Sequence, residues 1–410
     1  MTARVLFVGG EDNVLRLPFI LAMRERGFEV VAADSGDPAP FRKAGVEHAA
    51  FPFDRFISPL SDLRALRRLA ALLETLEPDI AQGFDTKPCL FLPLARGLSG
   101  ADTQVVRTIC GRAWVYSSRT PLALGARPVY RALHRLAARS TAATVFEIED
   151  DLEFFRRHRM AGRRGMVIPA GGGGVDVAGF GRALAAGPSA EALRDELGLG
   201  DAPVAITVTR VTRQKGVPAL LEAAARVHAV RPDVRFVLVG PRDSEGPLAV
   251  TEAEIAAHAP YLIATGARSD VPALLRMADL FVFPTEYREG VARVLLEASL
   301  AGLPIVSTAM PGCREVISDG WNGRLTPPGD PEALAEAVLE VLDDPDGGRA
   351  MAANAALQAR TVFSLDAIAD RHAALYAELL GERRADRAPG DGGGAAAGRE
   401  EAPPALIHSG

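Results

Sequence analysis

The chain has few cysteines and lacks the patterns of an exported or membrane-spanning protein. Its three cysteines, Cys89, Cys110 and Cys313, are far apart and form no C-x-x-C pair, which argues against a structural zinc site or a disulfide framework. The first residues contain only a short apolar stretch ended by glycines and acids, unlike a secretory signal. No apolar run approaches the ~18 to 20 residues that would span a bilayer. We therefore expect a protein of the reducing cytoplasm.

Clusters of acidic metal ligands and nucleic-acid-binding motifs are absent as well, so we expect neither a metal cofactor nor a nucleic-acid partner. The net charge of −6 is unevenly distributed. Residues 1–180 hold 24 Lys and Arg against 20 Asp and Glu, and the remaining residues hold 22 against 32. This basic first half favours an anionic acceptor or a membrane surface as its partner.

The length of 410 residues and the apolar content of 48% exceed what one hydrophobic core usually supports, which predicts two domains. Short apolar strands alternate with helical patterns, and this alternation predicts parallel sheets covered on both faces. We expect an α/β protein of two doubly wound, Rossmann-like domains, with ligands in the cleft between them. The expected parts are residues 1–180, a Gly-, Ala- and Pro-rich linker at 181–200, residues 201–363, a helix at 364–381 and a disordered tail at 382–410.

Two glutamates bracket the predicted start of a helix. A short apolar strand precedes Glu289, Gly290 permits a tight turn, and residues 291–301, which include Glu297, have helical composition. A helix start favours an anion such as a diphosphate by up to ~2 kcal/mol. Carboxylates are acceptor-only groups whose two oxygens suit adjacent hydroxyls. A nucleoside diphosphate sugar has two such diols, so the pattern indicates a nucleotide-sugar site.

The Glu289-x7-Glu297 spacing, together with the segments that follow it, resembles the retaining glycosyltransferases of family 4, the glycosyl transferases group 1, whose fold is called GT-B. The segments that carry the likeness are residues 301–308 (AGLPIVST) and residues 322–334 (NGRLTPPGDPEAL). Residues 287–290 (YREG) with 311–315 (PGCRE) are similar to bacterial enzymes that build surface polysaccharide or lipid-linked oligosaccharide, often from UDP-N-acetylhexosamines.

The resemblance implies that the two domains bind different substrates. Residues 1–180 would bind the acceptor, residues 201–363 would bind the nucleotide-sugar donor, and the helix at 364–381 would cross back to the first domain. It also implies retention by same-face attack, in which the leaving diphosphate oxygen helps to take the acceptor proton. No cofactor or metal is then expected, because Arg210 and Lys215 would take the place of a cation.

On the donor side, Arg210 closes the first strand of the second domain and Lys215 follows in a loop ahead of a helix. A charge-assisted contact contributes roughly 1.5 to 3 kcal/mol, so both could stabilise the departing diphosphate; a solvated basic loop is the alternative. The resemblance implies that Glu289 binds the donor sugar and Glu297 the ribose, although an exposed acid early in a helix is favoured without any ligand. The backbone amides expected near sugar and phosphate belong to Gly290, Val291 and Ala292.

Three further segments have weaker assignments. Arg268 lies in a loop that resembles the one whose backbone meets the nucleobase; a surface loop is the alternative. Gly9 and Gly10 end the first strand and could lie beside donor phosphate or acceptor, although a glycine pair there is often only a turn. Residues 171–174, a run of four glycines, resemble a family segment at the cleft, with a flexible connection as the alternative.

On the acceptor side the likeness is thinner, because many relatives have a histidine where this chain offers Asp85 and Lys87. Asp85 could accept a proton from the acceptor hydroxyl or orient it, and capping of the following helix is the alternative. Lys87 could hold an anionic acceptor, and Arg112 lies in a loop that could contact it.

Arginines at 127, 131, 135 and 139 recur every fourth residue and therefore share one face of a predicted helix. A solvated basic face is one interpretation. The other is contact with anionic lipid, where each basic residue contributes ~1 kcal/mol, enough for peripheral binding but not for insertion. On the second interpretation the protein would rest on the inner face of the plasma membrane.

Taken together, the sequence predicts a metal-independent retaining glycosyltransferase. It would move a hexose-type sugar from a nucleotide donor, UDP-linked by resemblance, to an acceptor hydroxyl in polysaccharide, glycolipid or lipid-linked oligosaccharide. A nucleotide-sugar 2-epimerase of the same two-domain plan is an alternative that the Glu289 to Glu297 spacing disfavours. A non-catalytic partner subunit that binds sugar nucleotides is a third possibility. The sequence does not specify the sugar, the acceptor, the linkage or the oligomeric state.

Overall fold

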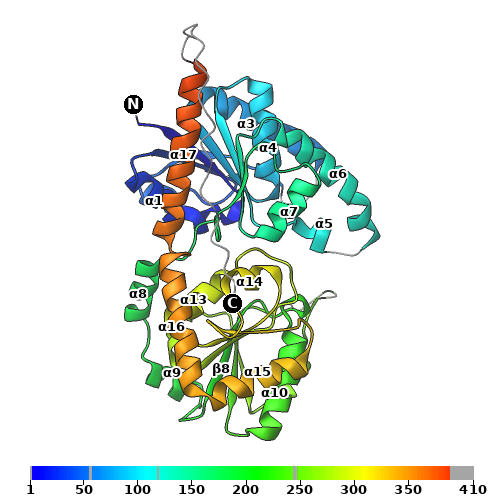
Figure 1. The fold of residues 1–410 in the computed structure, drawn as a ribbon, viewed down its shortest axis with the longest axis vertical. Helices are drawn as coiled ribbons and strands as arrows, with labels where there is room; N and C mark the ends of the chain where they lie inside the picture. Colours follow the sequence, from blue (N-terminus) through cyan, green and yellow to red (C-terminus); the bar gives the residue numbers. More distant parts are fainter. Residues whose placement is uncertain (1, 55–57, 118–119, 243–245, 247, 388–410) are drawn as a thin grey trace, which may run out of the picture.

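The computed structural model describes residues 2–54, 58–117, 120–242, 246 and 248–387 (Figure 1). Two parallel sheets, each covered by helices, form two stacked domains, which confirms the predicted pair of doubly wound units. Among the described residues, no helix is long and apolar enough to cross a membrane.

The first domain is built on a seven-stranded sheet with the order β3-β2-β1-β4-β5-β6-β7. Its strands are β1 (Arg4–Val8), β2 (Glu29–Asp34), β3 (Glu47–Ala50), β4 (Ile80–Phe84), β5 (Gln104–Ile109), β6 (Ala143–Phe146) and β7 (Gly165–Val167). Its helices are η1 (Glu11–Arg16), α1 (Leu17–Glu25), α2 (Ala39–Lys43), α3 (Pro59–Leu76), α4 (Thr86–Ser99), α5 (Ala113–Ser117), α6 (Pro121–Ala138) and α7 (Glu149–Arg157). Val5 to Val8 of β1 are fully buried, as a parallel strand with helices on both faces should be.

The second domain has a six-stranded sheet with the order β10-β9-β8-β11-β12-β13. Its strands are β8 (Val204–Val208), β9 (Arg235–Val239), β10 (Leu262–Gly266), β11 (Leu280–Phe283), β12 (Ile305–Thr308) and β13 (Arg324–Thr326). Its helices are η2 (Arg213–Lys215), α10 (Val217–Val230), α11 (Glu252–Ala256), α12 (Val271–Met277), α13 (Arg293–Ala301), α14 (Pro311–Val316), α15 (Pro331–Asp343) and α16 (Pro345–Thr361). In both sheets the strand order reverses beside the first strand, which places a ligand crevice at the carboxyl ends there.

The segment predicted as a linker, residues 181–200, is largely helical. It contains the end of α8 (Val177–Ala186) and all of α9 (Ala190–Glu196), and both helices pack against α12 of the second domain. The Asp176 and Ser189 side chains cap them by accepting hydrogen bonds from backbone amides three residues on. Alanine-rich composition with good caps therefore specifies helix here, where composition alone suggested a flexible connection.

The last described helix, α17 (Leu365–Arg387), packs against α1 and runs along the first domain (Figure 1). It buries Ile368, Leu375 and Tyr376 in that domain's core, while α16 before it lies on the second domain. The helix continues past residue 381, so the predicted disorder is wrong for residues 382–387. The rest of the predicted tail, residues 388–410, lies outside the described residues.

Candidate active site

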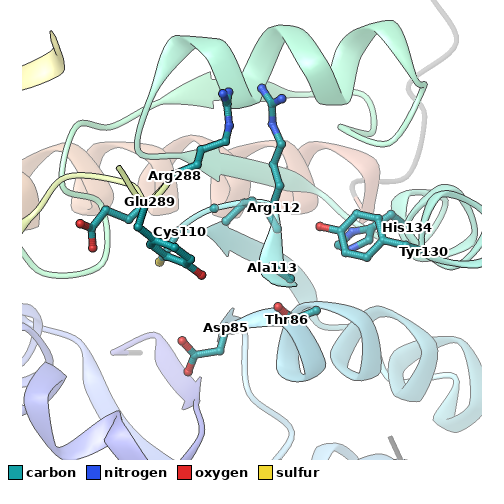
Figure 2. Close-up of a pocket in the computed structure, with 12 residues that line it drawn as sticks. Asp85, Thr86, Cys110, Arg112, Ala113, Tyr130, His134, Arg288 and Glu289 are labelled. Carbon is teal, nitrogen blue, oxygen red and sulfur yellow. The ribbon is translucent and has the colours of Figure 1, made fainter. Parts of the chain in front are cut away.

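A cavity of about 180 Å³ lies between the two domains (Figure 2). The first domain contributes the loops that follow β4 and β5, with a wall from α6, and the second contributes the loop that follows β11. The lining residues are Asp85, Thr86, Ile109, Cys110, Gly111, Arg112, Ala113, Tyr130, His134, Tyr287, Arg288 and Glu289. Three predicted site residues, Asp85, Arg112 and Glu289, therefore line one interdomain space.

Glu289 forms an ion pair with Lys215 at the edge of this cavity. The Lys215 Nζ atom donates to both carboxylate oxygens of Glu289, at 2.7 and 2.8 Å. Gly216 makes the approach possible, because its φ is +70° and a Cβ there would lie 1.7 Å from the Pro284 carbonyl oxygen. The predicted cation and carboxylate thus neutralise one another across 74 residues of sequence, with Lys215 almost completely buried.

Glu297 lies in the second turn of α13, half-buried beside the core residues Leu295 and Leu296. Burial raises the pKa of its carboxyl group, and Arg293 partly opposes this. Within the described residues its carboxylate has no hydrogen-bond or ion-pair partner. A half-buried carboxylate without a protein partner can accept hydrogen bonds from a ligand's hydroxyls.

Asp85 has an unusual backbone, with φ at +65° and ψ at 171°, in a region that residues other than glycine seldom adopt. It precedes α4, but its side chain makes no capping hydrogen bond, so the capping alternative is wrong. The carboxylate instead accepts hydrogen bonds from Arg16 at 3.0 Å and from the Gly10 amide at 3.3 Å. This backbone conformation costs about 1 to 3 kcal/mol, and it places the Asp85 carboxylate at the border of the cavity.

The glycine pair after β1 has two different roles. A Cβ on Gly9 would lie 2.4 Å from the buried Asn13 side chain, so packing inside the first domain already requires glycine there. The Gly10 amide donates a hydrogen bond to the Asp85 carboxylate. The pair therefore shapes the cavity rim through Asp85, and a direct role with donor or acceptor stays a prediction.

Four predicted cationic groups lie in different surroundings. Arg210 is exposed, and its guanidinium has no partner among the described residues. Lys87 donates to Asp62 and to the Asp54 carbonyl oxygen, both at 2.5 Å. Arg268 is bound by Asp270 and Glu196.

Arg112 donates to Asp150 at 2.5 Å and Asp151 at 2.6 Å on α7. Its side chain runs alongside Arg288 and away from Asp85 (Figure 2). The Arg112 and Lys87 side chains are thus neutralised by their own chain, which weakens their assignment to the acceptor. The Arg268 side chain is neutralised in the same way. A role for the backbone around Arg268 stays untested.

Sequence reasoning missed two residues that connect the domains here. Arg288, next to Glu289, forms an ion pair with Asp150 of the first domain, and burial lowers the pKa of its guanidinium to about 10. Glu147 follows β6 and is buried against the loop that begins at Gly290. The signal that could have found Glu147 is its place at the carboxyl end of a strand of a parallel sheet.

Two family models match this chain. Residues 202–344 match the family described as glycosyl transferases group 1, and residues 17–171 match the glycosyl transferase 4-like domain. The chain belongs to the group 1 glycosyltransferases. The two matches together cover more than half of the chain, and they favour a transferase over the epimerase that the sequence left open.

Several curated relatives of this glycosyltransferase are bacterial enzymes. Alpha-D-kanosaminyltransferase of Streptomyces kanamyceticus is 33% identical over 191 residues, which is 46% of this chain and only 48% of that protein. The N,N'-diacetylbacillosaminyl-diphospho-undecaprenol alpha-1,3-N-acetylgalactosaminyltransferase of Campylobacter jejuni is 27% identical over 89% of this chain and 95% of that protein. UDP-Gal:alpha-D-GlcNAc-diphosphoundecaprenol alpha-1,3-galactosyltransferase of Escherichia coli is 28% identical over 71% of this chain and 73% of that protein.

Solved structures share the GT-B fold with this glycosyltransferase. Anabaena HepE in complex with UDP superimposes with a TM-score of 0.73 at 19% identity, over 92% of this chain and 100% of that one. A glycosyltransferase from Rickettsia africae superimposes with a TM-score of 0.75 at 17% identity, over 92% and 99%. At these identities the likeness concerns the fold alone.

Proposed function

We propose that this glycosyltransferase moves a hexose-type sugar, with retention, from a UDP-sugar to an acceptor hydroxyl in polysaccharide, glycolipid or lipid-linked oligosaccharide synthesis. The observation that carries the proposal is the ion pair of Glu289 with Lys215 at the interdomain cavity, together with the unpartnered carboxylate of Glu297 on the next helix. The choice of UDP is supported by the UDP complex of HepE, and the lipid-linked acceptor by the diphospho-undecaprenol substrates for which the Campylobacter and Escherichia enzymes are named.

Each group in the site has a defined task in this proposal. Glu289 accepts hydrogen bonds from hydroxyls of the donor sugar, and Glu297 accepts them from the ribose diol. Lys215 and the exposed Arg210 neutralise the charge that develops on the departing diphosphate. The amides of Gly290 and Ala292 lie just ahead of α13, where the positive end of the helix dipole also favours a phosphate. The Val291 amide, predicted to lie near sugar and phosphate, donates instead to the Glu147 carboxylate.

Retention in this site needs no protein nucleophile. The acceptor hydroxyl attacks on the face that the diphosphate leaves, and a leaving phosphate oxygen takes its proton. Lys215 lowers the barrier by holding the negative charge of the leaving group in a partly desolvated place. We also propose that no metal ion is required. In the described part of the chain, no group of three or more His, Cys, Asp and Glu side chains is placed to hold one.

The acceptor enters from the first domain in this proposal. Asp85 faces the same cavity as Glu289, and its carboxylate is held in place by Arg16 and Gly10. A fixed carboxylate can orient an acceptor hydroxyl without being its base. We therefore assign Asp85, and not the sequestered Lys87 or Arg112, to the acceptor.

A panel of nucleotide sugars tests the function. The protein is incubated with each donor, with and without an undecaprenyl-diphosphate-sugar acceptor, and nucleotide release is measured. Slow UDP release from one UDP-sugar, accelerated by the acceptor, is the expected result. Sugar epimerisation, or binding without release from any donor, would overturn the proposal.

Glu297→Gln is expected to weaken donor binding by about 10-fold with little change in kcat, because the amide keeps one acceptor but loses the charge-assisted contact to the ribose. Calorimetric titration with UDP measures the dissociation constant. Because burial raises the pKa of Glu297, UDP affinity of the wild-type protein should also fall as the pH is lowered through that raised value. Equal affinities for wild type and variant across this pH range would remove Glu297 from the site.

We further propose that α6 rests on an anionic bilayer surface. Leu122, Val129, Leu133 and Leu136 share one face of the helix and are exposed, with 75% and 60% of Leu122 and Val129 accessible. Arg131 and Arg135 lie largely across the helix from this face, where Arg131 bonds the Arg127 carbonyl oxygen and Arg135 the His158 carbonyl oxygen. Arg139 lies to its side, and Arg127 packs against Tyr116 and bonds the Val115 carbonyl oxygen. The exposed apolar face, rather than the predicted basic one, is therefore the feature that α6 shares with helices that lie in a membrane interface.

The double variant Val129→Glu with Leu133→Glu is expected to reduce binding to vesicles of phosphatidylglycerol and phosphatidylcholine by at least about 10-fold, since two apolar side chains would be replaced by like charges. Cosedimentation measures the bound fraction. Leu357→Glu is the matched control, because Leu357 is similarly exposed, at 59%, on α16. Undiminished binding by the α6 variant, or an equal loss in the control, would contradict this orientation.

A further inference from the structure

Glu147 is a buried carboxylate between the two domains, with 7% of the residue exposed. Burial raises the pKa of its side chain, while the Gly172 amide, the Cys110 thiol, the charge of Arg16 and the Val291 amide oppose the rise. The Gly172 amide donates to Oε1 at 3.0 Å. No basic side chain among the described residues forms an ion pair with it. A buried carboxylate without a counter-ion costs free energy, so its position needs a reason beyond packing.

The carboxylate touches the loop that directly follows Glu289. A Cβ built on Gly290 would lie 2.0 Å from Glu147 Oε2, so only glycine admits this approach. The amide of Val291 faces the same carboxylate. On the other side, a Cβ on Gly172 of the first domain would lie 2.8 Å from Oε1. Glu147 is thus held between backbone segments of both domains.

Nearby contacts place the same two segments together. A Cβ on Gly312 would lie 1.9 Å from the Gly290 carbonyl oxygen, so α14 supports the loop from behind. The Glu149 amide at the start of α7 donates to Glu315 of α14 at 3.0 Å, across the domain gap. The segment after β6 therefore contacts both the loop that follows Glu289 and the helix α14 behind that loop.

We propose that Glu147 is a positioning residue for the transfer reaction. Its carboxylate fixes the Gly290 and Val291 backbone against the first domain, so that Glu289 and the neighbouring amides hold the sugar correctly only when the domains are closed. This inference rests on the donor role proposed for that loop.

The chemistry of the carboxylate explains why this residue is glutamate. Two acceptor oxygens can serve backbone amides of both domains at once. A glutamine would turn its own NH2 group toward one of these donors and leave it unpaired. A displacement of about 1 Å at the reacting centre can reduce the rate by about 100-fold, so this small change is enough to affect transfer.

Glu147→Gln tests the inference. The kcat for sugar transfer is expected to fall by at least about 10-fold. The dissociation constant for UDP should change less than about twofold, because the proposed UDP contacts of Glu297, Arg210 and Lys215 do not involve Glu147. Glu153→Gln, which removes the same charge from an exposed side chain of α7, is the matched control and should change neither quantity. An unchanged kcat in Glu147→Gln would overturn the inference. Failure of the wild-type protein to bind UDP would instead overturn the proposed donor site.

A second experiment uses the contact with Gly290 and does not depend on the stability of the glutamine variant. Gly290→Ala should lower kcat strongly, since its Cβ meets the carboxylate. In a Glu147→Ala background the same substitution should cost clearly less, because the obstructing side chain is shortened. Thermal unfolding of all four proteins checks that they are folded. Losses in ln kcat that simply add would show that residues 147 and 290 do not interact during turnover.

Discussion

Replacing Lys215 by alanine is expected to lower kcat by roughly 100-fold, the usual magnitude for losing one preorganised group that stabilises developing charge. The ammonium is buried beside Glu289, and a water molecule in its place would not carry its positive charge. Steady-state UDP release at saturating donor measures the effect. Circular dichroism should show an intact fold, because Lys215 lies at the end of a short turn rather than in a core.

Arg213→Ala is the matched control for this experiment. Arg213 lies two residues from Lys215 but is exposed and paired with Glu254 at 2.7 Å. Its loss should leave kcat within about twofold of the wild type, as expected for an exposed ion pair. Equal kcat values for the two variants would mean that Lys215 does not act on the leaving group.

Glu289→Gln is expected to lower kcat/KM for the donor by between about 10- and 100-fold, corresponding to the loss of one charge-assisted contact to the sugar. The amide keeps the shape of the side chain but removes the negative charge that holds Lys215 in place. Progress curves at low donor concentration give this ratio directly. The double variant with Lys215→Ala should lose less than the two single losses combined, because the residues act through one ion pair.

Glu286→Gln serves as the control for Glu289, since it removes the same charge three residues earlier in the same loop, from an exposed side chain. It should retain nearly full activity. If Glu286→Gln lowered kcat/KM as much as Glu289→Gln, the negative charge of the loop as a whole would matter more than a specific hydrogen bond from Glu289 to the sugar.

The fold could be predicted from the sequence because its determinants are local. Strand β1, for example, is a continuous apolar run from Val5 to Val8, and the glycine pair after it marks the turn that follows. The Glu289 to Glu297 spacing could also be found, because both residues belong to one strand, turn and helix unit. The family and the two-domain architecture are confirmed, whereas the roles of the individual residues stay predictions.

The remainder of the site depends on contacts between distant parts of the chain. The sequence offered Lys87 as a cation for the acceptor, but Lys87 pairs with a carboxylate 25 residues away, and Arg268 likewise pairs with one 72 residues away. The strained backbone of Asp85 has no sequence signature, since most such positions are glycine. The Glu147 carboxylate contacts Gly290 of the other domain, and no local sequence pattern reveals this contact.

A crystal structure with a bound UDP-sugar tests the central claim most directly. The proposed site predicts the ribose diol within hydrogen-bond distance of Glu297, the sugar hydroxyls on Glu289, and the diphosphate beside Lys215 at the start of α13. A nucleotide bound elsewhere, with Glu297 still without a partner and Lys215 still held only by Glu289, would contradict it.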